Sequence, residues 1–326
     1  MSKVLGLGNA LVDIIFQIDN DEILNEFALP KGSMTLVDSA KAKKILRATE
    51  GLPYEIAAGG SASNTIDALA KLEIQSGYIG KIGKDNHGDL FKKELISKHI
   101  NPILLYGFNP TGTAITLLSK DAERTFATYL GAAIEMEANE LNEVQFKGYT
   151  FFHIEGYLVQ NHDLILRAVS LAKKTGLTIS IDMASFTTVE ANKDFLKDLV
   201  KDYVNIVFAN EEEARSFTGE EPAAAARIIS EDCDIAVVKT GEEGSIIQDG
   251  INTRIIPAIK AELKDTTGAG DLYAAGFLYG LTKGYDLSLC GQIGSILGGK
   301  VIEVYGARLD DRSWADIRDE ITGLSG

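Results

Sequence analysis

Cysteine, histidine and basic residues are scarce in this chain of 326 residues. Its two cysteines, Cys233 and Cys290, are too few to cross-link a fold of this size, which indicates a reducing compartment. The four histidines show no metal-ligand spacing with one another or with the cysteines, so we expect no zinc site. No apolar run reaches the roughly 18 residues that a membrane span needs, so we expect no membrane-spanning segment.

Positive charge is in deficit, with 32 Lys and Arg against 47 Asp and Glu and a formal net charge of −15. A surface this negative repels phosphate backbones and anionic membranes, so neither nucleic acid nor a membrane is an expected partner. A phosphorylated ligand would need backbone N–H groups, a few well-placed cations or a metal ion. The composition is 45% hydrophobic and 24% charged, and the N-terminus lacks a signal-peptide pattern, so we expect a folded cytoplasmic protein.

The second half of the sequence alternates between short apolar runs and helical stretches. The runs are rich in β-branched or aromatic residues, the pattern of strands buried on both faces, and lie at 150–154, 177–181, 205–208 and 234–238. Helix-forming segments separate them, with apolar periodicity around 164–171 and further stretches at 193–203 and 223–230. This order predicts right-handed βαβ units and a mostly parallel sheet.

The first third differs, although 4–7 resembles a buried strand and 61–71 a helix. Four strand-like runs, at 14–18, 33–37, 114–118 and 125–129, have no helix between the members of each pair. We predict that residues 12–37 and 103–131 form a small antiparallel sheet. It would project from an α/β core made of residues 1–11, 38–102 and 132–326 and cover a cleft as a lid.

Two glycines, Gly6 and Gly8, follow the first predicted strand and suggest a dinucleotide-binding loop. The third glycine position holds Leu11, and no helix begins there, so the pattern is incomplete. A nicotinamide-dependent dehydrogenase is therefore a remote alternative. The glycines are equally explained by a chain that turns off the end of a strand.

The strongest motif is Asp265-Thr-Thr-Gly-Ala-Gly-Asp271, which precedes an apolar helical pattern. Gly268, Ala269 and Gly270 would present unobstructed N–H groups at the positive end of that helix, where an anion can bind. A carboxylate at the helix start, Asp271, could accept a proton from a hydroxyl while those N–H groups hold a phosphoryl group. The alternative is an N-cap aspartate after a glycine turn.

This motif resembles the second signature of the carbohydrate kinase family typified by ribokinase and adenosine kinase. The first signature is also recognisable, as Ala58-Gly-Gly-Ser-Ala-Ser-Asn64, and the likeness covers nearly the whole chain. The resemblance implies a ribokinase-like three-layer α/β sandwich with a central, mostly parallel sheet and a small β-sheet lid. It also implies an ATP-dependent kinase that uses magnesium and, in many members, a monovalent cation such as potassium.

The resemblance assigns roles around the acceptor. Asp13 is similar to the aspartate that binds sugar hydroxyls at the lid hinge, and Gly59, Gly60 and Asn64 to the loop that grips the same sugar. Glu155 would approach the sugar from a strand end.

Further roles concern the phosphates. Arg124 resembles a lid arginine over the transferred phosphate, and we expect its side chain to be mobile. Asn210 and Glu213 match an N-x-x-E motif that would organise magnesium through water. The segment with Lys239, Thr240, Gly241 and Gly244 would hold the nucleotide. Asp265 and Thr267 would give main-chain ligands to the monovalent cation.

The acceptor stays open between a nucleoside such as adenosine and a sugar such as ribose, fructose or 2-keto-3-deoxygluconate. The motifs around Asp13, Asn64 and Arg124 resemble adenosine kinase more closely, whereas Glu155 favours a sugar. A regulator that binds a nucleotide or sugar without catalysis is a remote alternative. Both a monomer and a homodimer fit the sequence.

Overall fold

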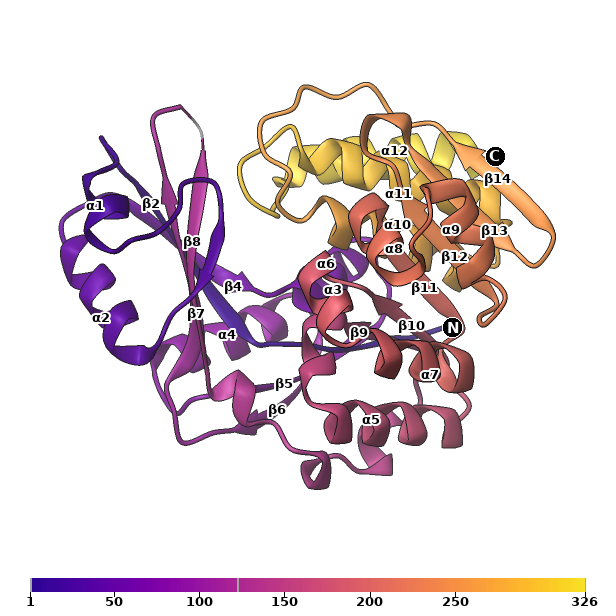
Figure 1. The fold of residues 1–326 in the computed structure, drawn as a ribbon, viewed down its shortest axis with the longest axis horizontal. Coiled ribbons are helices and arrows are strands. Elements are labelled where there is room, and N and C mark those ends of the chain that lie inside the picture. The colour runs from indigo at the N-terminus through magenta and orange to yellow at the C-terminus, as the bar shows by residue number, and fades with distance from the viewer. Residues whose placement is uncertain (1, 122, 326) are drawn as a thin grey trace.

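The computed structural model describes residues 2–121 and 123–325, which form two sheets with helices packed around them (Figure 1). The larger sheet has nine strands, in the spatial order β14 (Asn252–Ile256), β13 (Ser245–Asp249), β12 (Ile235–Lys239), β11 (Ile206–Asn210), β10 (Thr178–Asp182), β9 (Phe151–Glu155), β1 (Val4–Leu7), β5 (Ser76–Ile82) and β6 (Asn101–Tyr106). From β6 to β12 all neighbours pair in parallel, and β13 and β14 add an antiparallel edge. The predicted mostly parallel sheet is confirmed.

Helices cover both faces of this sheet. The strands alternate between two buried clusters, so that Val4 belongs to one and Leu5 to the other. The first cluster is completed by α3 (Ser61–Lys71), α4 (Asn86–Ser97), α10 (Ala269–Lys283), α11 (Leu287–Val301) and α12 (Asp311–Ser325). The second is completed by α5 (His162–Lys174), α6 (Phe186–Ala191), α7 (Lys193–Tyr203), α8 (Glu211–Thr218) and α9 (Pro222–Ile229). The result is the expected three-layer sandwich.

The second sheet has five strands, in the order β3 (Met34–Leu36), β8 (Arg124–Gly131), β7 (Thr111–Leu118), β2 (Leu11–Gln17) and β4 (Tyr54–Gly59). Helices α1 (Glu22–Glu26) and α2 (Ser39–Ala48) pack with it. Our prediction of an antiparallel sheet was wrong in part, because β2 pairs with β7, and β3 with β8, in parallel. Each of those pairs joins strands from different insertions, so no hairpin forces them to run antiparallel.

The sheets also divide the chain differently from the predicted segments. Strand β4 lies in the small sheet, although we placed residues 38–102 in the core. Strand β6 lies in the large sheet, although we began the second lid insertion at residue 103. Among the described residues, no helix is both long and apolar enough to cross a membrane. Cys233 and Cys290 are free thiols.

Candidate active site

Polar residues gather where the parallel strands of the large sheet end. Glu155, Asp182, Asn210 and Lys239 are the last residues of β9, β10, β11 and β12, and Asn9 follows β1. Because parallel strands end at one edge of a sheet, these side chains approach one another there. Ligands of open α/β sheets bind at this edge, so it is the candidate site.

Asp271 joins the two sequence signatures. Its Oδ1 accepts a 2.6 Å hydrogen bond from Ser61 Oγ, and its Oδ2 accepts a 2.9 Å bond from Asn64 Nδ2. Thr65 Oγ1 donates to the Asp271 carbonyl at 3.1 Å. Burial raises the pKa of Asp271 to about 6, against the opposing effect of the Ser61 and Asn64 bonds. The carboxylate is thus held in one place and is ionised at neutral pH.

The start of α10 has free backbone donors. Gly268 precedes the helix with φ +78°, and a Cβ there would lie 2.5 Å from the Ala307 Cβ, so only glycine fits. Within the described residues, no acceptor faces the N–H groups of Gly270 and Asp271. These donors lie at the positive end of the helix dipole, so the geometry can bind an anion beside the Asp271 carboxylate.

Asp13 lies on β2, which pairs with β4, and its carboxyl group lies against Gly59. A Cβ on Gly59 would lie 2.3 Å from the Asp13 carboxyl, so glycine at 59 makes room for that group. Gly60 has φ +97°, and its Cβ would lie 2.3 Å from the Asn9 carbonyl. Burial raises the pKa of Asp13 to about 6, and the charges of Arg308 and Arg124 oppose the shift. The structure therefore brings Asp13, Gly59 and Gly60 together.

Arg308 is a site residue that sequence reasoning missed. It donates a short hydrogen bond to the Ala58 carbonyl and lies 2.7 Å from Glu94 Oε2. Burial alone would raise the pKa of Glu94. The charge of Arg308 and the hydrogen bonds to Glu94 together outweigh burial, so the pKa of Glu94 is lowered. No pattern around Arg308 marks it in the sequence, because its partners lie more than two hundred residues away in the chain.

Glu155 does not fit the expected role at the sugar. It is 2% exposed, its Oε1 accepts a 2.6 Å bond from Asn9 Nδ2, and its Oε2 accepts a 3.2 Å bond from Ala62 N. Burial raises the pKa of Glu155 to about 7. The carboxyl group therefore fastens the start of α3 to the end of β1, beneath the site.

Arg124 also differs from expectation. We expected a mobile side chain, but only 6% of it is exposed, and its Nε lies 3.1 Å from Asp265 Oδ2, without the geometry of a hydrogen bond. The guanidinium also lies 5.9 Å from the centre of the Tyr305 ring. Arg124 is the first residue of β8. Its place in a predicted hairpin could not reveal that Asp265, far away in the sequence, would hold its side chain.

Asp265 has several partners besides Arg124. Its Oδ1 accepts from Thr267 N at 3.0 Å and from Thr267 Oγ1 at 2.7 Å, and its Oδ2 accepts from Gly306 N at 2.6 Å. The Asp265 side chain thus shapes the turn before α10. Main-chain ligation of a monovalent cation by Asp265 and Thr267 stays a prediction.

Asn210 and Glu213 form a reciprocal cap at the start of α8. Asn210 Oδ1 accepts from Glu213 N, while Asn210 N and Nδ2 donate to the two Glu213 oxygens, all at 2.8 Å. Glu213 is 3% exposed, and burial with the nearby Asp182 charge raises its pKa to about 7. Among the described residues, no three His, Cys, Asp or Glu side chains are arranged to hold a metal ion. Organisation of magnesium through water by Asn210 and Glu213 stays a prediction.

The predicted nucleotide segment connects β12 to β13. Thr240 N donates to the Gly244 carbonyl at 2.8 Å, and Gly241 and Gly244 have φ +55° and +102°. A Cβ on Gly244 would lie 1.9 Å from the Ile256 carbonyl, so this turn needs glycine for its own geometry. Nucleotide binding by Thr240, Gly241 and Gly244 stays a prediction.

Comparison with known proteins decides the family. The profile of the pfkB family of carbohydrate kinases matches residues 46–314. The chain belongs to this family. An adenosine kinase from Sinorhizobium meliloti is 32% identical, with a TM-score of 0.88 over 98% of this chain and 99% of that chain, and a probable sugar kinase from Rhizobium etli CFN 42 gives the same values. A nucleoside kinase from Methanocaldococcus jannaschii is 25% identical over 98% of this chain and 97% of its own length.

Membership in the pfkB family confirms the resemblance and makes the chain a kinase. It also removes the case for a dinucleotide loop at Gly6 and Gly8. A Cβ on Gly6 would lie 2.5 Å from Ile66 Cγ1, and one on Gly8 would lie 2.8 Å from the Ala62 Cβ. These glycines allow α3 to pack closely on β1.

The face of the small sheet that carries Asp13 also carries apolar side chains. In the strand register, Asp13 lies beside Ala114, which pairs with Thr128 and then Leu36. The adjacent row runs from Ile15 through Thr116 to Phe126 and Met34. Leu36 is 56% exposed, while Ile15 and Phe126 are half-buried. The alternation of side chains along a strand predicts that Ile15 shares a face with Asp13. Leu36 and Phe126 could not be placed on that face without the order of the strands in the sheet.

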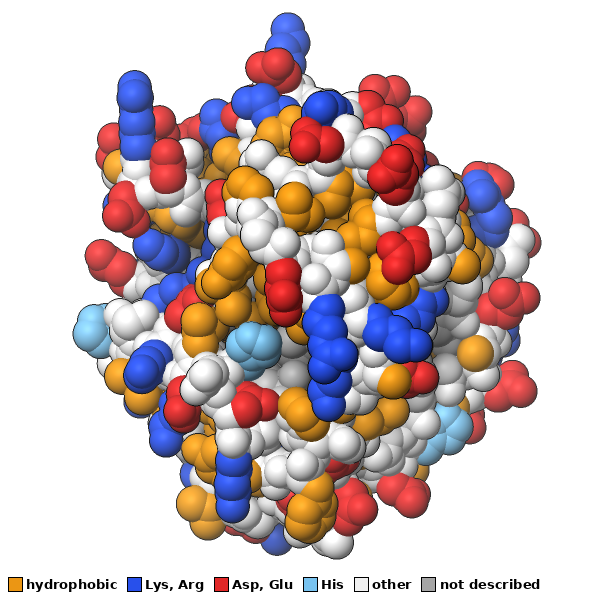
Figure 2. All heavy atoms as spheres, turned by 90° about the vertical axis from the view of Figure 1, so that its left-hand side faces the viewer, with side chains coloured by type: hydrophobic (Ala, Val, Ile, Leu, Met, Phe, Trp, Pro, Cys, Tyr) orange, Lys and Arg blue, Asp and Glu red, His pale blue; other side chains and the backbone are white. Residues whose placement is uncertain are grey.

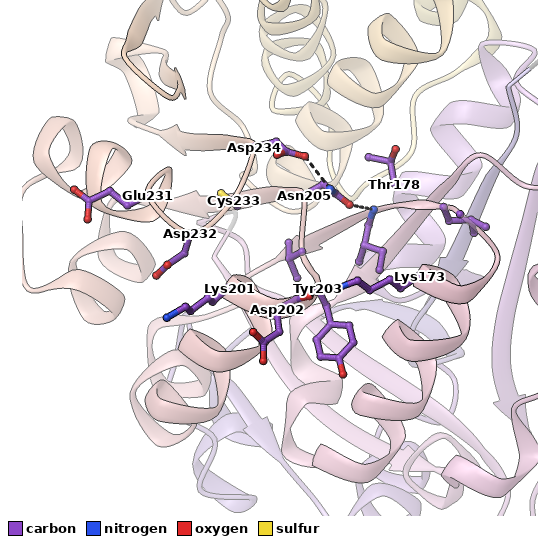
Figure 3. Close-up of a pocket in the computed structure, with 14 residues that line it drawn as sticks. Lys173, Thr178, Lys201, Asp202, Tyr203, Asn205, Glu231, Asp232, Cys233 and Asp234 are labelled. Atoms are coloured by element: carbon purple, nitrogen blue, oxygen red, sulfur yellow. Dashed lines mark hydrogen bonds between the residues drawn. The ribbon is translucent and has the colours of Figure 1, made fainter.

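One pocket lies away from this site. It has a volume of about 610 Å³ and is lined by residues at the amino ends of β10, β11 and β12 (Figure 3). Several of its polar groups are already paired: Lys173 Nζ donates to the Asp202 carbonyl at 2.7 Å, and Asn205 Nδ2 donates to Asp234 Oδ2 at 2.8 Å. On the side of the small sheet, Figure 2 shows Lys and Arg mixed with Asp and Glu.

Proposed function

We propose that this pfkB-family kinase transfers the γ-phosphoryl group of ATP to the hydroxymethyl group of a nucleoside, with adenosine as the best candidate. The observation that carries the proposal is the placement of Asp271. Ser61 and Asn64 hold its carboxylate at the start of α10, next to the free N–H groups of that helix. A base and an anion site thus lie side by side, as phosphoryl transfer requires.

The reaction follows from these groups. The hydroxymethyl oxygen attacks the γ-phosphorus, its proton passes to the Asp271 carboxylate, and the bond from the γ-phosphorus to the bridging oxygen of ADP breaks. The N–H groups of Gly270 and Asp271 hold the transferred phosphoryl group through the transition state. Because burial raises the pKa of Asp271 only to about 6, the group is an ionised base at neutral pH.

The apolar side chains beside Asp13 favour a nucleoside over a free sugar. Asp13 can accept hydrogen bonds from ribose hydroxyls, while Ile15, Leu36 and Phe126 on the same face offer apolar area for a base. The sequence argument for a sugar rested on Glu155, which is occupied with Asn9 and Ala62. The similarity to an adenosine kinase and a nucleoside kinase supports the same choice.

Magnesium would arrive with ATP, and potassium is a candidate monovalent cation. Lys239 would contact the nucleotide, as would the Thr240–Gly244 turn. We also propose a cytoplasmic protein, either monomeric or homodimeric, without a nucleic-acid or membrane partner.

A screen of acceptors tests the proposal. The purified chain is mixed with ATP and, in separate reactions, adenosine, inosine, guanosine, ribose, fructose or 2-keto-3-deoxygluconate, and ADP formation is followed. We expect the highest kcat/KM with a purine nucleoside. A higher kcat/KM with a sugar would reassign the acceptor, and binding without turnover for every compound would favour a non-catalytic regulator.

A further inference from the structure

A buried ion pair lies directly behind the start of α10. Lys239 Nζ is 2.8 Å from Asp182 Oδ2, and their side chains are 15% and 9% exposed. The other Asp182 oxygen accepts a 3.0 Å bond from Ala184 N, in a turn where Ala184 has φ +67°. The Asp182 carboxylate is therefore fixed through both oxygens, and it fixes the ammonium group of Lys239. The sequence motifs did not mark Asp182.

The ammonium group lies against the first turn of α10. A Cβ on Gly270 would lie 2.9 Å from Lys239 Nζ, while Gly270 itself has no positive φ. The helical backbone therefore does not require glycine at 270, and a side chain at this position would meet the ammonium group of Lys239. Among the described residues, Asp182 is the one hydrogen-bond partner of Lys239 Nζ, so further N–H bonds of the ammonium remain available to a ligand.

We propose that Asp182 is a positioning residue for phosphoryl transfer, which holds the Lys239 ammonium beside Gly270 so that it binds the transferred phosphoryl group together with the N–H groups of α10. This inference rests on the proposed function. The protein has a net charge of −15, which repels an anionic phosphoryl group. A cation at this point of the site offsets that repulsion. Asp182 sets where that cation lies, because a lysine side chain is flexible without a partner.

The pair also acts on the base from a distance. The negative charge of Asp182 raises the pKa of Asp271, and the positive charge of Lys239 lowers it. Asp13 on β2 and Glu155 on β9 also interact electrostatically with Asp271. Removing one member of the pair therefore shifts the pKa of Asp271 in a direction that depends on which member is removed.

Two single variants test the proposal in the full chain, Asp182→Asn and Lys239→Met. We expect each to lower kcat about 100-fold, because Asp182→Asn misplaces the ammonium group and Lys239→Met removes it, with the nucleoside KM within a few-fold. The acid limb of kcat should move to lower pH in Asp182→Asn and to higher pH in Lys239→Met. Unchanged kcat, or shifts in the same direction, would overturn the proposal.

A matched control separates positioning from folding. Lys81 and Glu140 form another ion pair, 2.8 Å apart and outside the site, in which the lysine is buried and the glutamate half-buried. Glu140→Gln should therefore change the melting temperature without moving kcat or the pH limb. If Asp182→Asn behaves like Glu140→Gln, its role is structural and the proposal fails.

Gly270→Ala adds a test that leaves Asp182 intact. The new methyl group would displace the ammonium, so kcat should fall in the wild-type background and change little further in Lys239→Met. An equal fold-loss in both backgrounds would show that Gly270 acts without Lys239, against the proposal. A wild-type chain that phosphorylates none of the acceptors defeats the proposed function, whereas an active chain with indifferent Asp182 variants defeats only this inference.

Discussion

Replacing Glu155 by glutamine should remove a pH-dependent loss of stability from this protein. The side chain is 2% exposed, and burial raises its pKa from 4.5 to about 7. Between these values the folded protein keeps a proton that the unfolded chain loses. The stability contributed by this group is therefore fully present below pH 4.5 and is lost as the pH rises to about 7. A displacement of this size corresponds to about 3 kcal/mol.

The assay is urea unfolding of the wild type and Glu155→Gln at pH 5 and pH 8. Between these two values the unfolding free energy of the wild type should fall about 2 to 3 kcal/mol further than that of the variant. Comparing the change in unfolding free energy between the two pH values removes any pH-independent cost of replacing the carboxyl group by an amide. The exposed Glu220→Gln serves as a control and should follow the wild type. Parallel curves for the wild type and Glu155→Gln would show that Glu155 is already ionised in the folded protein at pH 5, which refutes the reasoning.

Variants at three further positions test other parts of the site. Asp13→Ala should raise the nucleoside KM about 10- to 100-fold with little change in the KM for ATP, because it loses charge-assisted hydrogen bonds of about 1.5–3 kcal/mol each; initial rates check this, and an unchanged KM makes Asp13 structural. Arg124→Ala should lower kcat and the melting temperature together, since it leaves the buried Asp265 with one fewer partner, and Arg124→Lys should restore only part; full restoration by lysine contradicts this. Glu213→Gln should weaken the cap of α8 by about 0.5–2 kcal/mol and shift the dependence of the rate on magnesium. A melting curve measures the first effect and a magnesium titration of the rate the second. An unchanged titration would show that Glu213 only caps the helix.

The large sheet could be predicted because its strands and connecting helices follow clear local patterns of apolar residues. The predicted strand at 4–7 and the helices at 61–71 and 193–203 agree with β1, α3 and α7 to the residue. Each has a clear apolar period and a polar or glycine boundary. The small sheet could be predicted only in outline, because the pairing of β2 with β7 and of β3 with β8 joins segments about a hundred residues apart.

In the site, too, local motifs could be predicted from the sequence, whereas contacts made by folding could not. The contact of Asp271 with Ser61 and Asn64 follows from two compact motifs. Asp182 and Arg308 are single residues in segments without a motif, and their roles come from partners that only the folded chain supplies. Glu155 and Arg124 were recognised as polar residues near the site, but burial and pairing changed what they do.

The central claim is that Asp271 is the base for phosphoryl transfer to a nucleoside. The most direct test is the rate at which nucleoside monophosphate forms from adenosine and ATP, measured across pH 5 to 9 for the wild type and Asp271→Asn. Asp286→Asn is the matched control, because Asp286 caps α11 by accepting bonds from Ser288 N and Leu289 N at 2.8 and 3.1 Å. We predict that the wild-type rate falls with an acid limb near pH 6, that Asp271→Asn loses about a thousandfold in kcat without this limb, and that Asp286→Asn keeps both. Near-normal turnover by Asp271→Asn would contradict the claim.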